Sequence, residues 1–164
     1  MEGVPYETVD RAYESELATT YDSIKSYQLR FYYHGQWRPQ YDRWVAMLVG
    51  LYAGAGKGRV AWNQALTSDM IYTQPVVHEL RNLRAKTLLL IGDLDRAAPG
   101  ANRAPPQVAT RLGNYPELAR RAARTIPEAE LVEFPGLGHA PQVEAPDVFR
   151  KVLLAGLAGH ESQK

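Results

Sequence analysis

Apolar residues recur at helical spacing through the first half of the chain. From about residue 6 to residue 30 they line one face of a helix whose opposite face is polar, which predicts an amphipathic helix. The segment WRPQYDRWVAMLVGLY repeats this pattern after Pro39, until GAGKG breaks it. A third helix is expected to start near Arg59 and to run through Leu66, and a short fourth one is expected in TQPVVHELRNL. No strand pattern precedes residue 85.

The second half of the chain has a different pattern. The apolar run 87–91, closed by Gly92, is typical of a strand buried on both faces in a parallel sheet. AELVEF, residues 129–134, is a second short strand. YPELARRAART predicts a helix between them, and APDVFRKVLLAGLAG predicts a closing helix. This order of strand, loop and helix, repeated once, predicts an α/β arrangement with parallel strands.

Polar groups follow both predicted strands. Asp93 and Asp95 come directly after the first, and His139 follows the second in the glycine and proline loop PGLGHAP. Ligands of parallel sheets bind at the carboxyl ends of the strands, so these groups are expected to meet there. A histidine that takes a proton near neutral pH, with a carboxylate to fix its tautomer, is the acid–base half of a Ser-Asp-His triad. The alternative is that these are ordinary loop residues, with Asp93 bonding its own backbone.

Two stretches that carry these groups resemble the α/β-hydrolase family. LLLIGDLDRAAP is similar to the family's acid-bearing strand and turn, and LVEFPGLGHAPQVEAPDVFRKVL to its histidine loop and final helix. The resemblance implies that the catalytic acid is Asp95, three residues past the glycine, and that the catalytic histidine is His139. Residues 83–158 then look like the C-terminal part of the fold, and 1–82 look like the helical cap inserted before it.

The resemblance implies a fold class and a division of the chain. We expect the C-terminal half of an α/β-hydrolase fold, with parallel strands, flanking helices and an α-helical cap. The cap region would be 1–82 and the core region 83–164. Between Asp95 and His139, APPQVATRLGNYPELARR is expected to add a helical excursion.

The nucleophile that the family uses is missing from the sequence. It sits in G-x-S-x-G on a strand-to-helix turn ahead of the cap, and none of the five serines has that context. An HGGG-type oxyanion loop is missing too. We therefore expect the nucleophile, Ser or Asp, to lie upstream of Met1 in a longer hydrolase, and this chain to be inactive alone. The missing N-terminal half of the fold is then a partner of these 164 residues.

Aromatic residues suggest where a substrate binds. The chain has 10 Tyr and 3 Trp, concentrated in its first half. Tyr32, Tyr33 and Trp37 lie in a break between predicted helices, so they are candidates to face a pocket for a small-molecule substrate, and Trp62 and Tyr72 are weaker candidates. The alternative is that these rings pack between helices.

Composition excludes several classes of protein. Apolar residues make up 45% and charged residues 23%, as in a soluble globular domain. The net charge is +1 with scattered Lys and Arg, so nucleic acid is not an expected partner. No apolar run approaches the length of a membrane span, and the polar, acidic start is unlike a signal peptide. Cysteine is absent, which excludes a thiol nucleophile and disulfides. The compartment is not readable.

The resemblance implies hydrolysis of an ester or related carboxylic bond, with no metal or organic cofactor. An Asp nucleophile would instead suit dehalogenation or epoxide hydrolysis. A different class of function is a hydrolase-like binder of a ligand or protein, and a third possibility is one half of a split hydrolase. The histidines His34, His78 and His160 have no partners at metal-ligand spacing and are interpreted as surface or loop residues.

Overall fold

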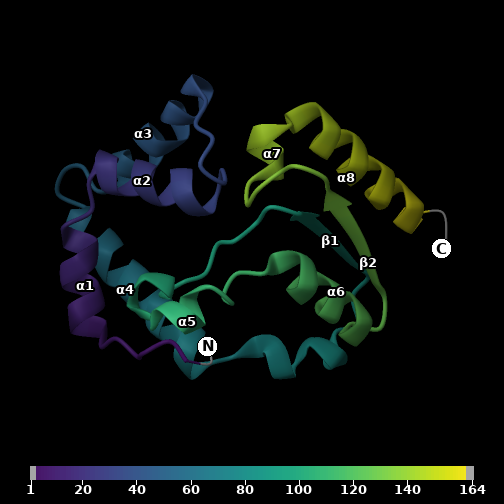
Figure 1. Ribbon diagram of the computed structural model, residues 1–164, viewed down its shortest axis with the longest axis horizontal. Helices are drawn as coiled ribbons and strands as arrows, with labels where there is room; N and C mark the ends of the chain where they lie inside the picture. The colour runs from purple at the N-terminus through teal and green to yellow at the C-terminus, as the bar shows by residue number, and fades with distance from the viewer. Residues whose placement is uncertain (1–2, 162–164) are drawn as a thin grey trace. The chain divides into compact units, whose positions relative to one another are not determined.

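The computed structural model describes residues 3–161, with side chains up to residue 159, and the chain divides into two compact units (Figure 1). The first unit consists of the chain up to Arg30, Gln36–Val76 and Ala98–Leu112, and the second of Phe31–Gly35, Val77–Ala97 and the chain from Gly113 onward. The assignment of 1–82 to a cap and 83–164 to a core concerns the roles of those segments and stays a prediction.

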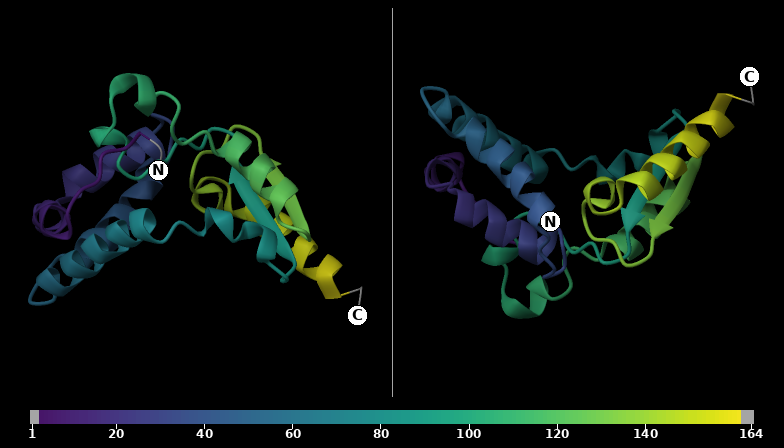
Figure 2. Two further views of the ribbon diagram at one scale, coloured as in Figure 1. Left: turned by 90° about the horizontal axis from the view of Figure 1, so that it is seen from below. Right: turned by 90° about the horizontal axis from the view of Figure 1, so that it is seen from above.

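The first unit is helical. Its elements are the helices α1 (Val9–Leu17), α2 (Tyr21–Phe31, whose last residue belongs to the second unit), α3 (Asp42–Leu51), α4 (Lys57–Thr73) and α5 (Pro106–Ala109), with the 3₁₀ turns η1 (Pro39–Tyr41) and η4 (Ala101–Arg103). Helices α1 and α4 pack side by side (Figure 2). Ala12 of α1 and Ala61 and Ala65 of α4 are buried, and the Tyr13 ring meets the Trp62 ring edge-on at 5.5 Å.

The predicted single helix over residues 6–30 is wrong, because the chain forms two helices there. Thr20 and Ser23 explain the break between α1 and α2. The Ser23 hydroxyl accepts the Thr20 N–H at 2.9 Å, and the Thr20 hydroxyl accepts the Ser23 N–H at 3.2 Å. This reciprocal pair caps a new helix N-terminus, which a count of apolar positions does not register.

The other helix predictions had mixed outcomes. The helix after Pro39 is confirmed as η1 and α3, and the third is confirmed as α4. The predicted fourth helix is wrong: its place is taken by two 3₁₀ turns, η2 (Val76–His78) and η3 (Leu80–Asn82). Two β-branched valines directly after Pro75 have low helix propensity and explain why no full α-helical turn forms.

The second unit is built on two parallel strands. β1 (Thr87–Gly92) and β2 (Ala129–Phe134) pair in register from Thr87 with Ala129 to Gly92 with Phe134. Both strands were predicted, and so were α6 (Tyr115–Thr125) and α8 (Pro146–Glu161). The short helix α7 (Pro141–Glu144) was not. Parallel pairing brings the carboxyl ends of the two strands to one edge of the sheet, where the loops with Asp95 and His139 begin.

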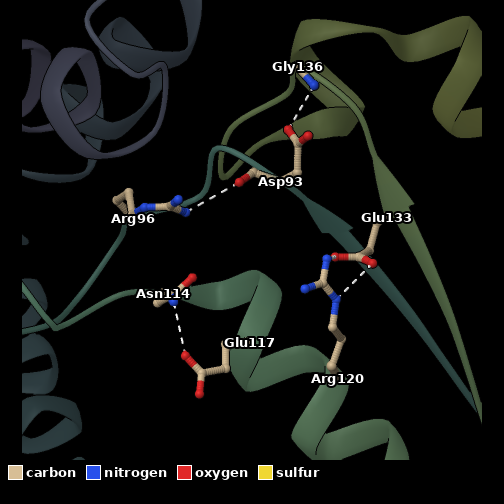
Figure 3. Close-up of polar contacts among 7 residues, drawn as sticks. All are labelled: Asp93, Arg96, Asn114, Glu117, Arg120, Glu133 and Gly136. Carbon is tan, nitrogen blue, oxygen red and sulfur yellow. Dashed lines mark hydrogen bonds and ion pairs between the residues drawn. The ribbon is translucent and has the colours of Figure 1, made fainter.

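Helices α6 and α8 cover opposite faces of this sheet (Figure 1). Leu88 and Phe134 share one face, since they are an even number of positions apart in the paired register. That face meets α8: a Cβ on Gly156 would lie 2.6 Å from the Leu88 side chain, and the Phe134 ring stacks on Phe149 at 5.9 Å. Glu133 points to the other face, where it binds Arg120 of α6 at 2.8 Å (Figure 3).

The apolar run of β1 is less buried than its sequence predicts. Its residues from Thr87 to Ile91 are all half-buried, although helices lie on both faces. The sheet has only two strands in the part of the chain that the structure describes, so the outer edge of each strand has no neighbouring strand there. β1 thus has the apolar sequence of a strand from the interior of a wider sheet, although it is an edge strand here.

Candidate active site

The turn after β1 is tied to the loop after β2. Gly92 has no room for a side chain, because a Cβ there would lie within 3.0 Å of the carbonyl oxygens of Leu137 and Gly138. The Leu94 N–H donates to the Leu137 carbonyl at 2.9 Å. The Asp93 carboxylate accepts the Gly136 N–H at 2.7 Å, which joins the two loops directly (Figure 3). Asp93 therefore bridges the loops, in contrast to its alternative interpretation as a turn residue bonded to its own backbone.

Asp95 and His139 form a hydrogen-bonded pair. Asp95 Oδ2 lies 2.9 Å from His139 Nδ1, and Asp95 Oδ1 accepts the Ala97 N–H at 2.9 Å. The Asp95 side chain is only 5% exposed, whereas that of His139 is 32% exposed. A buried carboxylate on Nδ1 favours the tautomer with the proton on that nitrogen. The other nitrogen, Nε2, is then available to exchange a proton with a reacting group.

Two tyrosine rings lie against the imidazole of His139. The Tyr32 ring centroid lies 4.3 Å from that of His139, and the Tyr115 ring approaches it edge-on at 6.0 Å. Burial raises the pKa of both tyrosines, and the nearby Asp95 carboxylate raises the pKa of each further. Both hydroxyls therefore stay protonated near neutral pH and can act as hydrogen-bond donors beside the histidine.

The five aromatic residues predicted to bind substrate fall into both units. Tyr32 and Tyr33 belong to the second unit, where Tyr32 contacts His139 and Tyr33 is buried. Trp37, Trp62 and Tyr72 belong to the first unit, and each packs edge-on against another ring of that unit, at 5.6, 5.5 and 5.9 Å respectively. Packing against other rings thus accounts for these three within their own unit, and a role in binding substrate stays a prediction for all five.

Sequence reasoning missed three residues of the site. Tyr115 lies within the helical excursion between Asp95 and His139, and its position in the sequence carries no catalytic pattern. Glu144 lies 3.5 Å from His34, and its other carboxylate oxygen accepts the Gly138 N–H at 2.7 Å. His34 is a loop residue, as expected, but its pairing gave no signal in the sequence. The side chain of His160 lies outside the described part of the chain.

The described residues offer no metal-binding group. Between residues 3 and 161, no three His, Cys, Asp or Glu side chains are grouped so that they could hold a metal ion. Over the same range, none of the helices combines the length and apolar character needed to cross a membrane.

Comparison with known proteins identifies the fold. The profile of the alpha/beta hydrolase family matches residues 9–152. A probable hydrolytic enzyme from Pseudomonas aeruginosa is similar in structure, with a TM-score of 0.89 and 54% sequence identity over 94% of this chain. An alpha/beta hydrolase enzyme from a Medee basin deep-sea metagenome library shares the fold, with a TM-score of 0.53 and 19% identity over 92% of this chain. No curated protein matches the chain at a significant level.

The paired loops, the parallel strands and the family match place this chain in the alpha/beta hydrolase family. The predicted fold class is thereby confirmed. The chain spans about half the length of the two solved structures, covering 50% of the first and 48% of the second. It therefore corresponds to part of the fold that those two structures contain.

Proposed function

We propose that this chain supplies the acid–base pair of a Ser-Asp-His triad that hydrolyses an ester or related carboxylic bond of a small molecule. His139 is the general base, and Asp95 is the carboxylate that orients it. The nucleophile and the oxyanion hole come from residues outside these 164. The observation that carries the proposal is the contact of 2.9 Å between the buried Asp95 Oδ2 and His139 Nδ1.

The proposed first step forms an acyl-enzyme. As the nucleophile's oxygen attacks the carbonyl carbon, its proton moves to Nε2 of His139, and the imidazolium is stabilised by the ionised Asp95. The imidazolium then gives that proton to the departing alcohol, and the C–O bond to the alcohol breaks. In the second step, His139 takes a proton from water as the water oxygen attacks the acyl carbon. The imidazolium then gives that proton to the nucleophile's oxygen as its bond to the acyl carbon breaks, which releases the acid. This chemistry uses protons and side chains alone and calls for no metal or organic cofactor.

The surroundings of His139 support the proposal. An exposure of 32% leaves the imidazole accessible to a reacting group, while the 5% exposure of Asp95 keeps its charge out of water. Burial of the carboxylate strengthens its electrostatic effect on an imidazolium. Tyr32 contacts the imidazole and is our candidate for contact with the acyl part of the substrate.

The same arrangement leaves a second candidate function. A hydrolase-like binder could keep the fold without catalysis, but it would have no use for a buried carboxylate held on a histidine. A split hydrolase would use the pair as proposed, with the nucleophile on a separate polypeptide. It predicts that the chain copurifies with a protein that carries a nucleophile elbow.

A direct test uses the chain alone. It should hydrolyse no p-nitrophenyl ester above the buffer rate, and a fluorophosphonate probe should label none of its serines, since none of the five lies in a G-x-S-x-G context. Labelling at any serine, or ester hydrolysis abolished by the substitution of one, would sink the proposal that the nucleophile comes from elsewhere.

A further inference from the structure

The loop that carries His139 is held by a segment distant in sequence. The His139 N–H donates to the Tyr32 carbonyl at 2.9 Å. Gly138 fits against the same carbonyl only because it has no side chain: a Cβ there would lie within 3.0 Å of the Tyr32 oxygen. The backbone before and at His139 is therefore fixed against Phe31–Gly35, which belongs to the same compact unit.

Glu144 adds a buried carboxylate to this arrangement. Its side chain is 5% exposed, and its Oε1 accepts the Gly138 N–H at 2.7 Å. Its Oε2 lies 3.5 Å from His34 Nε2. A carboxylate is buried at a high cost unless its oxygens are bonded, and a charge-assisted bond to a backbone N–H is among the stronger hydrogen bonds. The contact to Gly138 thus fixes the peptide directly before His139.

His34 stands in an unusual backbone conformation. Its φ is +43°, in the left-handed region that non-glycine residues rarely adopt, and Gly35 after it has a φ of +83°. The His34 side chain is 20% exposed. A strained backbone conformation persists only where surrounding contacts hold it in place. For His34, one such contact is with Oε2 of Glu144, the carboxylate oxygen that does not bind Gly138.

We propose that Glu144 is a positioning residue for His139. Its Oε1 holds the Gly138 amide, and through it keeps Nδ1 of His139 at hydrogen-bonding distance from Asp95. His34 holds Oε2, so that the carboxylate keeps one orientation. The proposal rests on the proposed role of His139 as the general base, and it adds the group that fixes the peptide directly before that base.

The test follows two protons by NMR in the full chain labelled with ¹⁵N. One is the Gly138 amide proton, and the other is the proton between His139 Nδ1 and Asp95. E144L removes the acceptor at similar size, and E144Q retains an acceptor oxygen. D147N is the matched control, since Asp147 lies three residues further on with a side chain 88% exposed.

We expect E144L to speed solvent exchange of the His139 Nδ1 proton by about tenfold or more, the factor that corresponds to the loss of one charge-assisted hydrogen bond. The Gly138 amide signal should shift upfield. E144Q should stay within about threefold of the unsubstituted chain because an amide oxygen still accepts the Gly138 N–H. D147N should change neither signal.

Three outcomes would overturn the proposal: an E144L chain that exchanges as the unsubstituted one does, an E144Q chain as disturbed as E144L, or a D147N chain as disturbed as E144L. If circular dichroism shows that E144L does not fold, H34N decides, because asparagine tolerates a positive φ but has no imidazole. Faster exchange of the Gly138 amide in H34N supports the proposal, and an unchanged rate overturns it. Neither readout involves hydrolysis, so a failure of the proposed function would be seen separately.

Discussion

The close approach of the two loops of the candidate site at Gly92 yields a prediction with a calculable size. In G92A, the new methyl group would lie within 3.0 Å of three backbone atoms, the carbonyl oxygens of Leu137 and Gly138 and the carbonyl carbon of Leu137. All three belong to backbone, so no side chain can rotate away. The loop that ends in His139 has to move.

The expected cost follows from the packing. Overfilling a tightly packed site typically costs about 1–3 kcal/mol, and backbone obstruction places G92A near the upper end, about 3 kcal/mol. The lower backbone entropy of alanine in the unfolded chain offsets about 0.4–1 kcal/mol of this loss of stability. The net loss of about 2–2.6 kcal/mol corresponds to a fall in Tm of about 4–10 °C for a chain of this size.

G136A is the matched control in the same pair of loops. Gly136 has a φ of +73°, but no other atom lies within 4 Å of the place that a Cβ would take, so its substitution tests backbone strain without a clash. We expect it to cost about 1–2 kcal/mol. Thermal unfolding followed by circular dichroism measures both variants, and the His139 Nδ1 proton signal reports whether the loop moved. A G92A chain that melts within about 2 °C of the unsubstituted one, or above G136A, would refute the reasoning.

Two further predictions concern Asp95 and Tyr32. In D95N, the amide oxygen can still accept the Ala97 N–H, but the amide nitrogen cannot accept a hydrogen bond from His139 Nδ1. The ¹⁵N shifts of the neutral imidazole should therefore show its proton on Nε2. Retention of the Nδ1 proton would contradict the pairing. Because burial, followed by the Asp95 charge, raises the pKa of Tyr32, the stability from burying its neutral hydroxyl is fully present below the unfolded value of about 10 and is lost as the pH rises through the higher folded pKa. Absorbance titration at alkaline pH should therefore show a tyrosine that ionises above the ordinary tyrosine range and that Y32F removes. If the tyrosine that Y32F removes ionises at or below that range, the reasoning is contradicted.

The sequence carried enough information for the elements next to the candidate site. The runs that became β1 and β2 are short, apolar and closed by polar turns, so local pattern suffices to find them. Parallel pairing then places Asp95 near His139, because both follow strand ends at one edge of the sheet. Their hydrogen bond is the structural counterpart of the pair that the two loops predicted.

Other features depend on contacts that no local pattern encodes. Tyr115 and Glu144 reach the histidine loop from other elements, and neither has a neighbour in the sequence that signals the contact. The break between α1 and α2 depends on the two side chains of a capping pair. Trp62 was open to two interpretations from the sequence. Its ring packs against that of Tyr13, and a role in binding substrate stays a prediction.

The most direct test of the central claim is an ester hydrolysis assay on a reconstituted enzyme. The Pseudomonas aeruginosa protein is 54% identical to this chain over the matched region. The chain would be joined to the part of that protein that lies outside the match. We predict that the joined protein hydrolyses p-nitrophenyl esters, that H139Q lowers the rate by about a thousandfold or more and D95N by a similar order, and that D147N leaves it unchanged. A folded joined protein that hydrolyses esters equally well with H139Q, or that hydrolyses none, would contradict the assignment of His139 and Asp95 as the acid–base pair.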